Sequence, residues 1–254
     1  MSDQPWGLDR TLRSRFECKY LVSEDLAQEI VRHASPYLEL DHFSARSERH
    51  RYPVHSLYLD GPGYELYETT NQGMKNRFKL RIRGYDSDPE SPLFAEVKRR
   101  ADRVILKRRA LISRDDARAL LKGSPLPEDS HAQGAEFAEF RSLAARLAAR
   151  PAVYVSYMRE AYEAVGPEPV RLTLDRDLRN AAPSLSDPFD FANQEWKITP
   201  CEQTILELKF TDSCPHWVEQ LIQRFSLDRC SVAKYILCLD NYMAREAHMQ
   251  RRFA

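Results

Sequence analysis

Charged and hydrophobic residues alternate along several short segments of the chain, which predicts β-strands with one charged and one apolar face. The clearest segment spans residues 77–83 and reads RFKLRIR. Because residues i and i+2 of a strand point to the same face, its four cations share one face and its apolar residues share the other. Shorter segments repeat the alternation at residues 17–19, 96–98, 107–109, 157–159 and 207–209. The pattern therefore predicts a sheet with a mostly basic face.

The same pattern, with turn and capping residues, places the other elements. Strands are expected at residues 14–22, 54–60, 77–85, 93–100, 104–112, 152–164, 168–176 and 204–210. Helices are expected at residues 23–35, 113–121, 135–150, 215–225 and 231–243, with a helical turn at 64–70. Residues 41–51 are expected to form a loop, and residues 180–200 an irregular segment with at most one short strand.

This order of elements is mixed and lacks the regular alternation of a doubly wound α/β sheet. A closed barrel explains a basic face better than a flat sheet, because closure also removes the sheet edges. We therefore predict an α+β fold, an antiparallel β-barrel (tunnel) with flanking helices. The barrel is expected to form a single domain over residues 13–243, between a flexible leader at 1–12 and a basic tail at 244–254.

The charge balance restricts the partners of the basic face. The chain has 38 basic and 38 acidic residues, so its net charge is zero, yet seven of the twelve residues from Lys98 to Arg109 are basic. A local anion site is therefore expected, and nucleic acid is not, since Phe78 alternates with the cations and should face away from them. The sequence has no apolar run long enough to span a membrane and no apolar signal segment. Five cysteines without a C-x-x-C pair suit reduced thiols, so a cytoplasmic location is expected.

No glycine-rich phosphate loop is present, and neither are the motifs H-E-x-x-H and G-x-S-x-G. Any phosphate must therefore be bound by side chains. Cations spaced roughly 7 Å apart on one strand face repel one another and need water or a polyanion between them. Glu17, Glu96 and Glu207 share faces with these cations. The pattern leaves two roles open for them: cross-strand salt bridges, or ligands of Mg²⁺ or Mn²⁺.

Several segments in this order resemble the polyphosphate polymerase (VTC-type) domains of the triphosphate tunnel metalloenzyme, or CYTH-like, group. The resemblance covers roughly residues 14–242. It is carried by the segments RFECKY at 15–20, VHSLYLD at 54–60, KLRIRGY at 79–85, FAEVKRR at 94–100, YMR at 157–159, ILELKF at 205–210 and AKY at 233–235. One departure is Ala233, where the family often has serine, so one hydroxyl that could bind phosphate is missing.

The resemblance implies a basic tunnel that binds a nucleoside triphosphate or polyphosphate. The cations expected to act in catalysis are Lys19, Arg81, Arg83, Lys98 and Arg159. The residues expected to bind substrate are Lys79, Lys107, Arg109, Tyr157, Lys209 and Lys234. The metal-binding glutamate falls on Glu207, with Glu17 and Glu96 as secondary candidates, and the cofactor is expected to be Mn²⁺ or Mg²⁺.

Three functions stay open at this point. The first is a phosphotransferase that moves the γ-phosphoryl group of ATP, or another nucleoside triphosphate, to inorganic polyphosphate. It is favoured because an anionic terminal phosphate needs alignment and charge neutralisation rather than a general base. The second is a metal-dependent inorganic triphosphatase, which needs a carboxylate to position water. The third is a polyphosphate-binding module without catalysis. Eukaryotic relatives carry fused membrane segments, so a membrane partner protein is a further expectation.

Overall fold

The computed structural model describes residues 16–101, 104–128, 130, 132–184 and 187–253. The leader expected at residues 1–12 lies outside the described residues. The strands are β1 Phe16–Val22, β2 Leu38–Leu40, β3 Tyr52–Asp60, β4 Asn76–Gly84, β5 Leu93–Ala101, β6 Val104–Ile112, β7 Arg150–Ala164, β8 Val170–Ala181, β9 Lys197–Ile198 and β10 Thr204–Phe210. The helices are α1 Glu24–Ala34, α2 His42–Arg46, the 3₁₀ turn η1 Glu48–His50, α3 Glu65–Asn71, α4 Arg114–Lys122, α5 Ala135–Arg146, α6 His216–Arg224 and α7 Lys234–Phe253.

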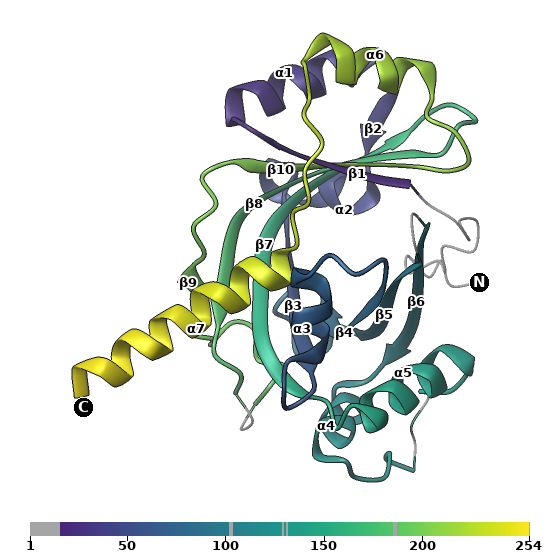
Figure 1. Cartoon of the computed structure of the whole chain (residues 1–254). Helices are drawn as coiled ribbons and strands as arrows, with labels where there is room; N and C mark the ends of the chain where they lie inside the picture. Colours follow the sequence, from purple (N-terminus) through teal and green to yellow (C-terminus); the bar gives the residue numbers. More distant parts are fainter. Residues whose placement is uncertain (1–15, 102–103, 129, 131, 185–186, 254) are drawn as a thin grey trace.

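The strands form one antiparallel sheet that curls around a charged inner face (Figure 1). Its order is β1-β10-β8-β7-β3-β4-β5-β6, with β2 paired to β7 and β9 paired to β8. An α+β fold with an antiparallel sheet and flanking helices is thereby confirmed. Closure by pairing is not found: among the described residues β1 and β6 end the ladder, and the two strands touch without pairing. Across this gap Lys98 of β5 donates a hydrogen bond to Glu17 of β1 at 2.8 Å.

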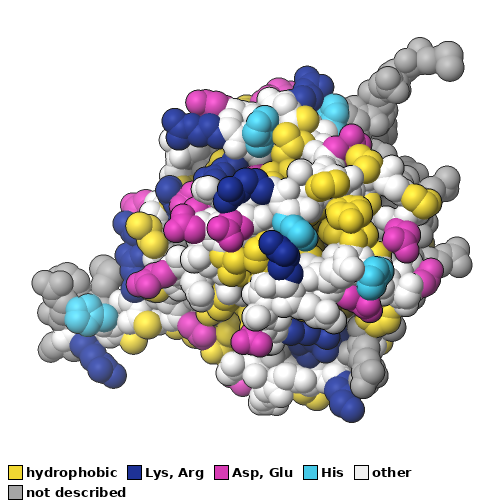
Figure 2. Space-filling view, turned by 90° about the horizontal axis from the view of Figure 1, so that it is seen from above, with side chains coloured by type: hydrophobic (Ala, Val, Ile, Leu, Met, Phe, Trp, Pro, Cys, Tyr) yellow, Lys and Arg dark blue, Asp and Glu magenta, His cyan; other side chains and the backbone are white. Residues whose placement is uncertain are grey.

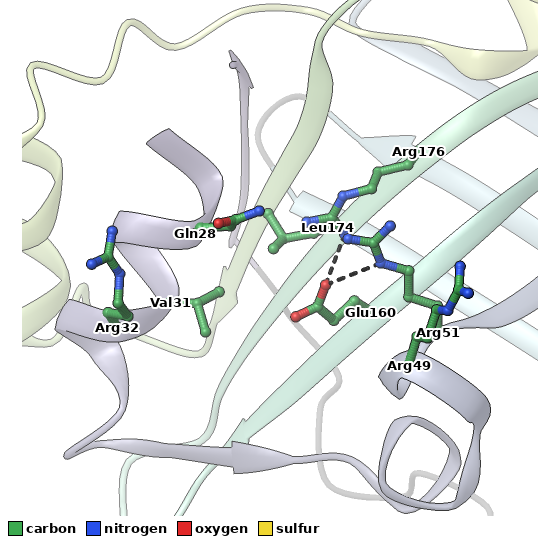
Figure 3. Close-up of a pocket in the computed structure, with 8 residues that line it drawn as sticks. All are labelled: Gln28, Val31, Arg32, Arg49, Arg51, Glu160, Leu174 and Arg176. Carbon is green, nitrogen blue, oxygen red and sulfur yellow. Dashed lines mark hydrogen bonds and ion pairs between the residues drawn. The ribbon is translucent and has the colours of Figure 1, made fainter. Parts of the chain in front are cut away.

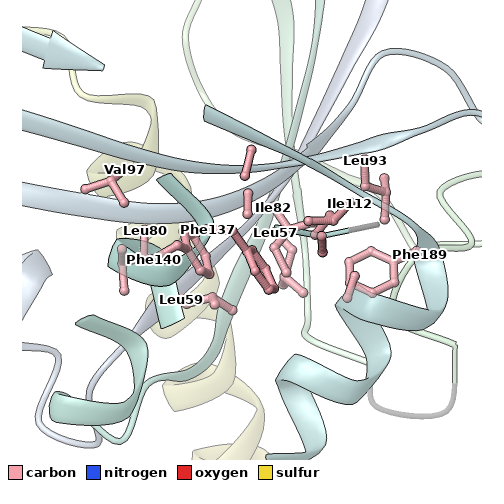
Figure 4. Packing of buried hydrophobic residues seen from close by; sticks show 14 of the residues in the cluster. Leu57, Leu59, Leu80, Ile82, Leu93, Val97, Ile112, Phe137, Phe140 and Phe189 are labelled. Atoms are coloured by element: carbon pink, nitrogen blue, oxygen red, sulfur yellow. The ribbon is translucent and has the colours of Figure 1, made fainter. Parts of the chain in front are cut away.

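Hydrophobic residues on the outer face of the sheet pack under helices, as the alternation requires. On β4, Leu80 and Ile82 are fully buried and contact the cluster that contains Phe137 and Phe140 of α5 (Figure 4). A second cluster lies between β1, β8 and β10 and the helices α1 and α6. A third lies beneath the first turns of α7. Because the apolar side chains are used on the outside, the charged ones are left to face inward.

Local capping fixes the helix starts that the sequence predicted. The Ser23 hydroxyl accepts a hydrogen bond from the Leu26 amide at 3.2 Å, and Ser113 forms a capping box with Asp116 at the start of α4. Several boundaries were predicted wrongly. Helix α7 continues to Phe253 instead of ending at 243, α5 ends at Arg146, and β8 runs on to Ala181. The expected loop at 41–51 contains α2 and η1, because Asp41 caps α2 by accepting from the Ser44 amide at 2.7 Å.

The outer surface over α1 and α6 does not gather charge of one sign. Figure 2 shows basic and acidic side chains interspersed on this face, with some hydrophobic residues between them. No helix among the described residues is long and apolar enough to cross a membrane. The cations that alternate along the strand segments lie instead in rows on the inner face of the sheet.

Candidate functional site: a basic inner face

The register of β4, β5 and β6 places their cations in rows across the inner face. Lys79 lies opposite Lys98, which lies opposite Lys107. One step along the strands, Arg81 lies opposite Glu96, which lies opposite Arg109. The first row has no carboxylate and the second has one, so the positive charge on these three strands exceeds the negative charge.

Glu96 is the counter-ion of the second row. Its side chain is fully buried, and its carboxylate lies 2.6 Å from Arg81, 2.8 Å from both Lys107 and Arg109, and 4.0 Å from Arg83. Burial acts to raise the pKa of Glu96, but these four cations together hold the pKa well below its ordinary value. One permanently charged carboxylate therefore stabilises four cations that would otherwise repel one another.

Lys79 has no such partner. Among the described residues it forms no hydrogen bond or ion pair, although Lys19, Lys98 and Arg81 surround it. Burial, and then the repulsion of these cations, lowers the pKa of Lys79 well below its ordinary value. The half-buried ammonium group is therefore held where its charge has to be compensated by water or by an anion from outside the protein.

Two carboxylates, Glu17 and Glu207, lie on the paired strands β1 and β10. Glu17 accepts hydrogen bonds from Lys98 at 2.8 Å, and Glu207 lies 3.3 Å from Lys209. Burial acts against ionisation of Glu207, whereas Lys209, Lys19 and a hydrogen bond with Glu17 hold its pKa well below the ordinary value. The two glutamates are therefore neighbours, and both are 5–6 % exposed.

The C-terminal helix α7 contributes one more cation, Lys234, to the inner face. Asp175 of β8 binds the Arg159 guanidinium in a bidentate pair at 2.7 and 2.8 Å, and binds Lys234 of α7 at 2.7 Å. The neighbouring residue Tyr235 donates a 2.5 Å hydrogen bond to Asp60, which fixes the start of the helix. Helix α7 thus brings Lys234 to the same face as β7 and β8.

Tyrosine hydroxyls hold three of the arginines in place. Arg81 donates to Tyr58 at 3.0 Å, Arg83 donates to Tyr157 at 3.3 Å, and Arg109 donates to Tyr85. Tyr157 also lies beneath Lys234, whose ammonium is 4.9 Å from the ring centroid. Because each guanidinium is anchored on one side, its remaining N–H groups keep a fixed direction.

The pKa values of the neighbouring groups follow from the same crowding. Burial lowers the pKa of Lys209 to about 8, although Glu207 and Glu17 act in the opposite direction. Burial, together with the charge of Arg109, lowers the pKa of Lys107 to about 7 against the effect of Glu96, although this side chain is 41 % exposed. Burial acts to raise the pKa of Tyr85, yet Lys107, Arg83 and Arg109 lower it to about 7. Groups that change charge near neutral pH are typical of functional sites.

Glu207 and Glu17 are the residues that fit a divalent metal ion. Both supply carboxylate oxygens, which Mg²⁺ and Mn²⁺ prefer, and they lie side by side on neighbouring strands. Among the described residues no group of three or more acidic, histidine or cysteine side chains could hold a metal ion. A metal at this pair would therefore complete its shell with water and phosphate oxygens, which is the usual arrangement for Mg²⁺ with nucleotides. Glu96, the other sequence candidate, is bound instead to the cations of β4 and β6.

The structure brings the sequence candidates together on one face, from β1, β4, β5, β6, β7, β10 and α7. The sequence placed Asp175 among the carboxylates that could form salt bridges or bind a metal, but it was not selected as a site residue, and neither was Tyr58 or Tyr85. Asp175 lies four residues from Arg171, the nearest cation on the same face of its strand, whereas each glutamate lies two residues from a cation. In the structure its partners come from β7 and α7. Tyr58 lies in a segment of mostly apolar residues. No local pattern distinguishes such positions from ordinary core residues.

Comparison with known proteins identifies relatives of the sequence and of the fold. The sequence profile of the VTC domain matches residues 14–242. No curated protein sequence matches the chain. Among solved structures, a candidate adenylate cyclase from Bacillus halodurans is 14 % identical, with a TM-score of 0.50 over 86 % of this chain and 93 % of that one. A candidate adenylyl cyclase from Hippeastrum, described as having a dominant triphosphatase activity, is also 14 % identical, with a TM-score of 0.50 over 90 % and 95 % of the two chains. At this identity the two structures show a shared fold.

Proposed function

Because the chain belongs to the VTC domain family, we propose that it is a metal-dependent phosphotransferase that binds ATP and inorganic polyphosphate on its basic inner face. In this proposal it transfers the γ-phosphoryl group of ATP to the end of a phosphate chain. The five free thiols suit the reducing cytoplasm in which ATP would be available. A membrane partner protein that receives the product stays a prediction.

Lys79 is the single observation that carries the proposal. It lies in a row with Lys98 and Lys107, and no described residue neutralises it. A phosphate chain provides one negative charge after another at regular spacing and can neutralise such a row, whereas a single small anion cannot. Arginines already anchored by Tyr58, Tyr157 and Tyr85 would then contact the chain with their free N–H groups.

The state of the carboxylates favours transfer to phosphate over hydrolysis. Glu96 binds four cations and Glu17 binds Lys98 and Lys19, so both have low pKa values and are weak bases. Activation of water would need a stronger base. A terminal phosphate is already anionic, so alignment by Lys and Arg and charge neutralisation are sufficient.

The roles of the residues follow from their positions. Lys98, Arg81 and Arg83 would orient the triphosphate and neutralise charge that develops on the transferred group. Arg159 and Lys234, both held by Asp175, would bind the opposite end of the phosphates. A divalent ion held by Glu207 and Glu17 would supply further neutralisation of the phosphate oxygens.

The products formed from ATP and Mn²⁺ test the proposed reaction. We expect ADP and long polyphosphate, visible on a gel, and we expect Lys98→Ala to abolish both because it removes a cation and a partner of Glu17. Release of orthophosphate without polyphosphate would establish a triphosphatase instead. Tight binding of ATP without any turnover would establish a binding module and refute catalysis.

A substitution at Lys79 tests the binding role separately. Lys79→Met is expected to increase the free energy of unfolding by about 1 kcal/mol without ligand, because it removes a buried, repelled charge. It is also expected to weaken tripolyphosphate binding about tenfold or more, as loss of a charged hydrogen bond does. Urea unfolding and calorimetric titration measure the two effects. Lys122→Met, on the exposed end of α4, is the matched control and should change neither. A Lys79→Met protein that is less stable and binds equally well would contradict the role.

A further inference from the structure

A second basic site lies on the opposite face of the sheet, outside the cluster described above. A cavity of about 310 Å³ is lined by Gln28, Val31, Arg32, Arg49, Arg51, Glu160, Leu174 and Arg176 (Figure 3). Its walls come from α1, η1 and the strands β7 and β8. We propose that this cavity, called the outer pocket below, binds a small phosphorylated solute independently of the inner face.

Strand alternation separates the outer pocket from the inner face. Arg159 and Asp175 form the inner-face pair between β7 and β8, whereas Glu160 and Arg176 are the next residues on these strands. Successive residues of a strand point to opposite faces. A phosphate chain bound on the inner face therefore cannot reach the outer pocket, and the two sites take separate ligands.

Two of the pocket arginines are held in place by carboxylates. Arg176 binds Glu24 at 2.6 Å and Glu160 at 2.9 Å. Arg51 binds the same two residues at 3.1 and 3.6 Å, and Figure 3 shows dashed lines from one oxygen of Glu160 to both guanidinium groups. Glu24 also accepts from Thr204, and Glu160 accepts from Tyr162. These contacts fix the two arginines and occupy three of the roughly four acceptor sites of each carboxylate.

The positive charges of the other two pocket arginines, Arg32 and Arg49, are hardly neutralised by neighbouring carboxylates. Arg49 is exposed and has no ion pair or hydrogen bond among the described residues, and Arg32, whose side chain is 74 % exposed, has only a 3.9 Å side-chain contact with Glu29. Four arginines therefore face three carboxylates, Glu24, Glu160 and Glu29, and the pocket has a positive excess of one charge. Guanidinium groups match the oxygens of phosphate in pairs, and the Gln28 amide can donate one more hydrogen bond.

The backbone at Arg49 is held in an unfavourable conformation. Its φ of 54° and ψ of 24° lie in the left-handed region, and the φ of His50 is 58°. Such a position usually takes glycine or asparagine, because the Cβ of other residues is strained there. The turn places Arg49 beside Arg51 at the rim of the outer pocket (Figure 3). Val31 and Leu174 contribute an apolar wall to the pocket.

Titration with tripolyphosphate, followed by calorimetry, tests the outer pocket. The parent protein is expected to bind two molecules. Arg32→Ala/Arg49→Asn should bind one, because it removes the two arginines with unused charge, and asparagine tolerates the left-handed backbone. Arg46→Ala, an exposed arginine of α2 outside the pocket, should still bind two. The inner-face variant Lys79→Met/Lys98→Ala should keep the binding event that Arg32→Ala/Arg49→Asn loses.

The outcomes separate this proposal from the proposed function, on which it does not depend. If the inner face did not bind phosphates, the parent would bind one molecule, and only Arg32→Ala/Arg49→Asn would lose it. The outer pocket is refuted if Arg32→Ala/Arg49→Asn binds with the stoichiometry and affinity of the parent. Flotation with phosphatidylcholine vesicles, with and without phosphatidic acid, tests a lipid headgroup as the occupant. Binding to the acidic vesicles that this double variant loses would overturn the assignment to a solute, and absence of the protein from both vesicle fractions supports it.

Discussion

Glu96→Gln is expected to lower the free energy of unfolding by about 3–5 kcal/mol at neutral pH, as removal of one partner from a buried ion pair does. Arg81, Lys107 and Arg109 lie within 2.8 Å of this carboxylate, and all would lose their counter-ion at once. The loss is a large part of the 5–15 kcal/mol that stabilises a typical domain. Urea unfolding measures it. Tripolyphosphate should restore more stability to Glu96→Gln than to the parent, because it replaces the missing charge.

A matched control distinguishes this effect from the loss of any salt bridge. Glu139→Gln removes a carboxylate that binds Arg99 at 2.6 Å, but that arginine is 40 % exposed. It is expected to cost at most about 1 kcal/mol, as exposed pairs do. Equal destabilisation by both variants would show that Glu96 is an ordinary salt-bridge partner.

The loss of stability at acid pH is an independent measure of what the Glu96 carboxylate contributes to the free energy of unfolding. Its folded pKa is depressed below the ordinary 4.5, so its contribution to stability is complete above that pH. The contribution is lost as the pH falls through the folded value, because the unfolded state then binds the proton more readily. The parent should lose stability below about pH 4.5, and Glu96→Gln should lose less over the same range.

Glu207→Gln is expected to lower the metal-dependent rate of ADP release about 10²–10³-fold at saturating ATP, which corresponds to several kcal/mol of transition-state stabilisation. The amide retains the shape of the side chain but not the charge that would hold Mn²⁺ beside Glu17. Binding of tripolyphosphate without metal should change less than tenfold, because Lys19, Lys98 and Lys79 remain. Direct Mn²⁺ binding, measured by calorimetry in the presence of a non-hydrolysable ATP analogue, should weaken in parallel with the rate.

Glu195→Gln is the control for this substitution, since Glu195 is 90 % exposed and lies outside the inner face. It should leave the rate and Mn²⁺ binding unchanged. If Glu207→Gln kept more than a third of the parent rate, or lost the rate with Mn²⁺ binding intact, Glu207 would not be the metal ligand.

The alternation of charge along the chain was sufficient to predict the sheet and the direction of its basic side chains. Residues 77–83 show why: Leu80 and Ile82 are fully buried under α5, so Lys79, Arg81 and Arg83 must point the other way. The period of two decides this locally, and no knowledge of neighbouring strands is needed.

The ion-pair partner of each side chain, and whether the sheet closes into a barrel, depend on contacts between distant segments. A local pattern could therefore not predict them. Asp175 binds a strand neighbour and a helix residue, and only the docking of α7 through Tyr235 brings Lys234 to it. The seam between β1 and β6 depends on how far the sheet curls, which twist and packing decide together. The outer pocket likewise needs α1, η1 and β8 in place at once.

The pairing of β1 with β10 also governs when the basic inner face can be completed during synthesis. Glu17 and Lys19 find Lys209 and Glu207 only after roughly 190 further residues have left the ribosome, which takes about 10–40 s at ordinary translation rates. Until then β1 has no strand to pair with. Its unpaired backbone N–H and C=O groups can pair with another chain and cause aggregation, unless a chaperone binds them. A nascent chain therefore exposes the cations of β1 and β4 to β6 well before β10 is made, and a stalled ribosome would release a fragment in which Glu17 has no Glu207 beside it.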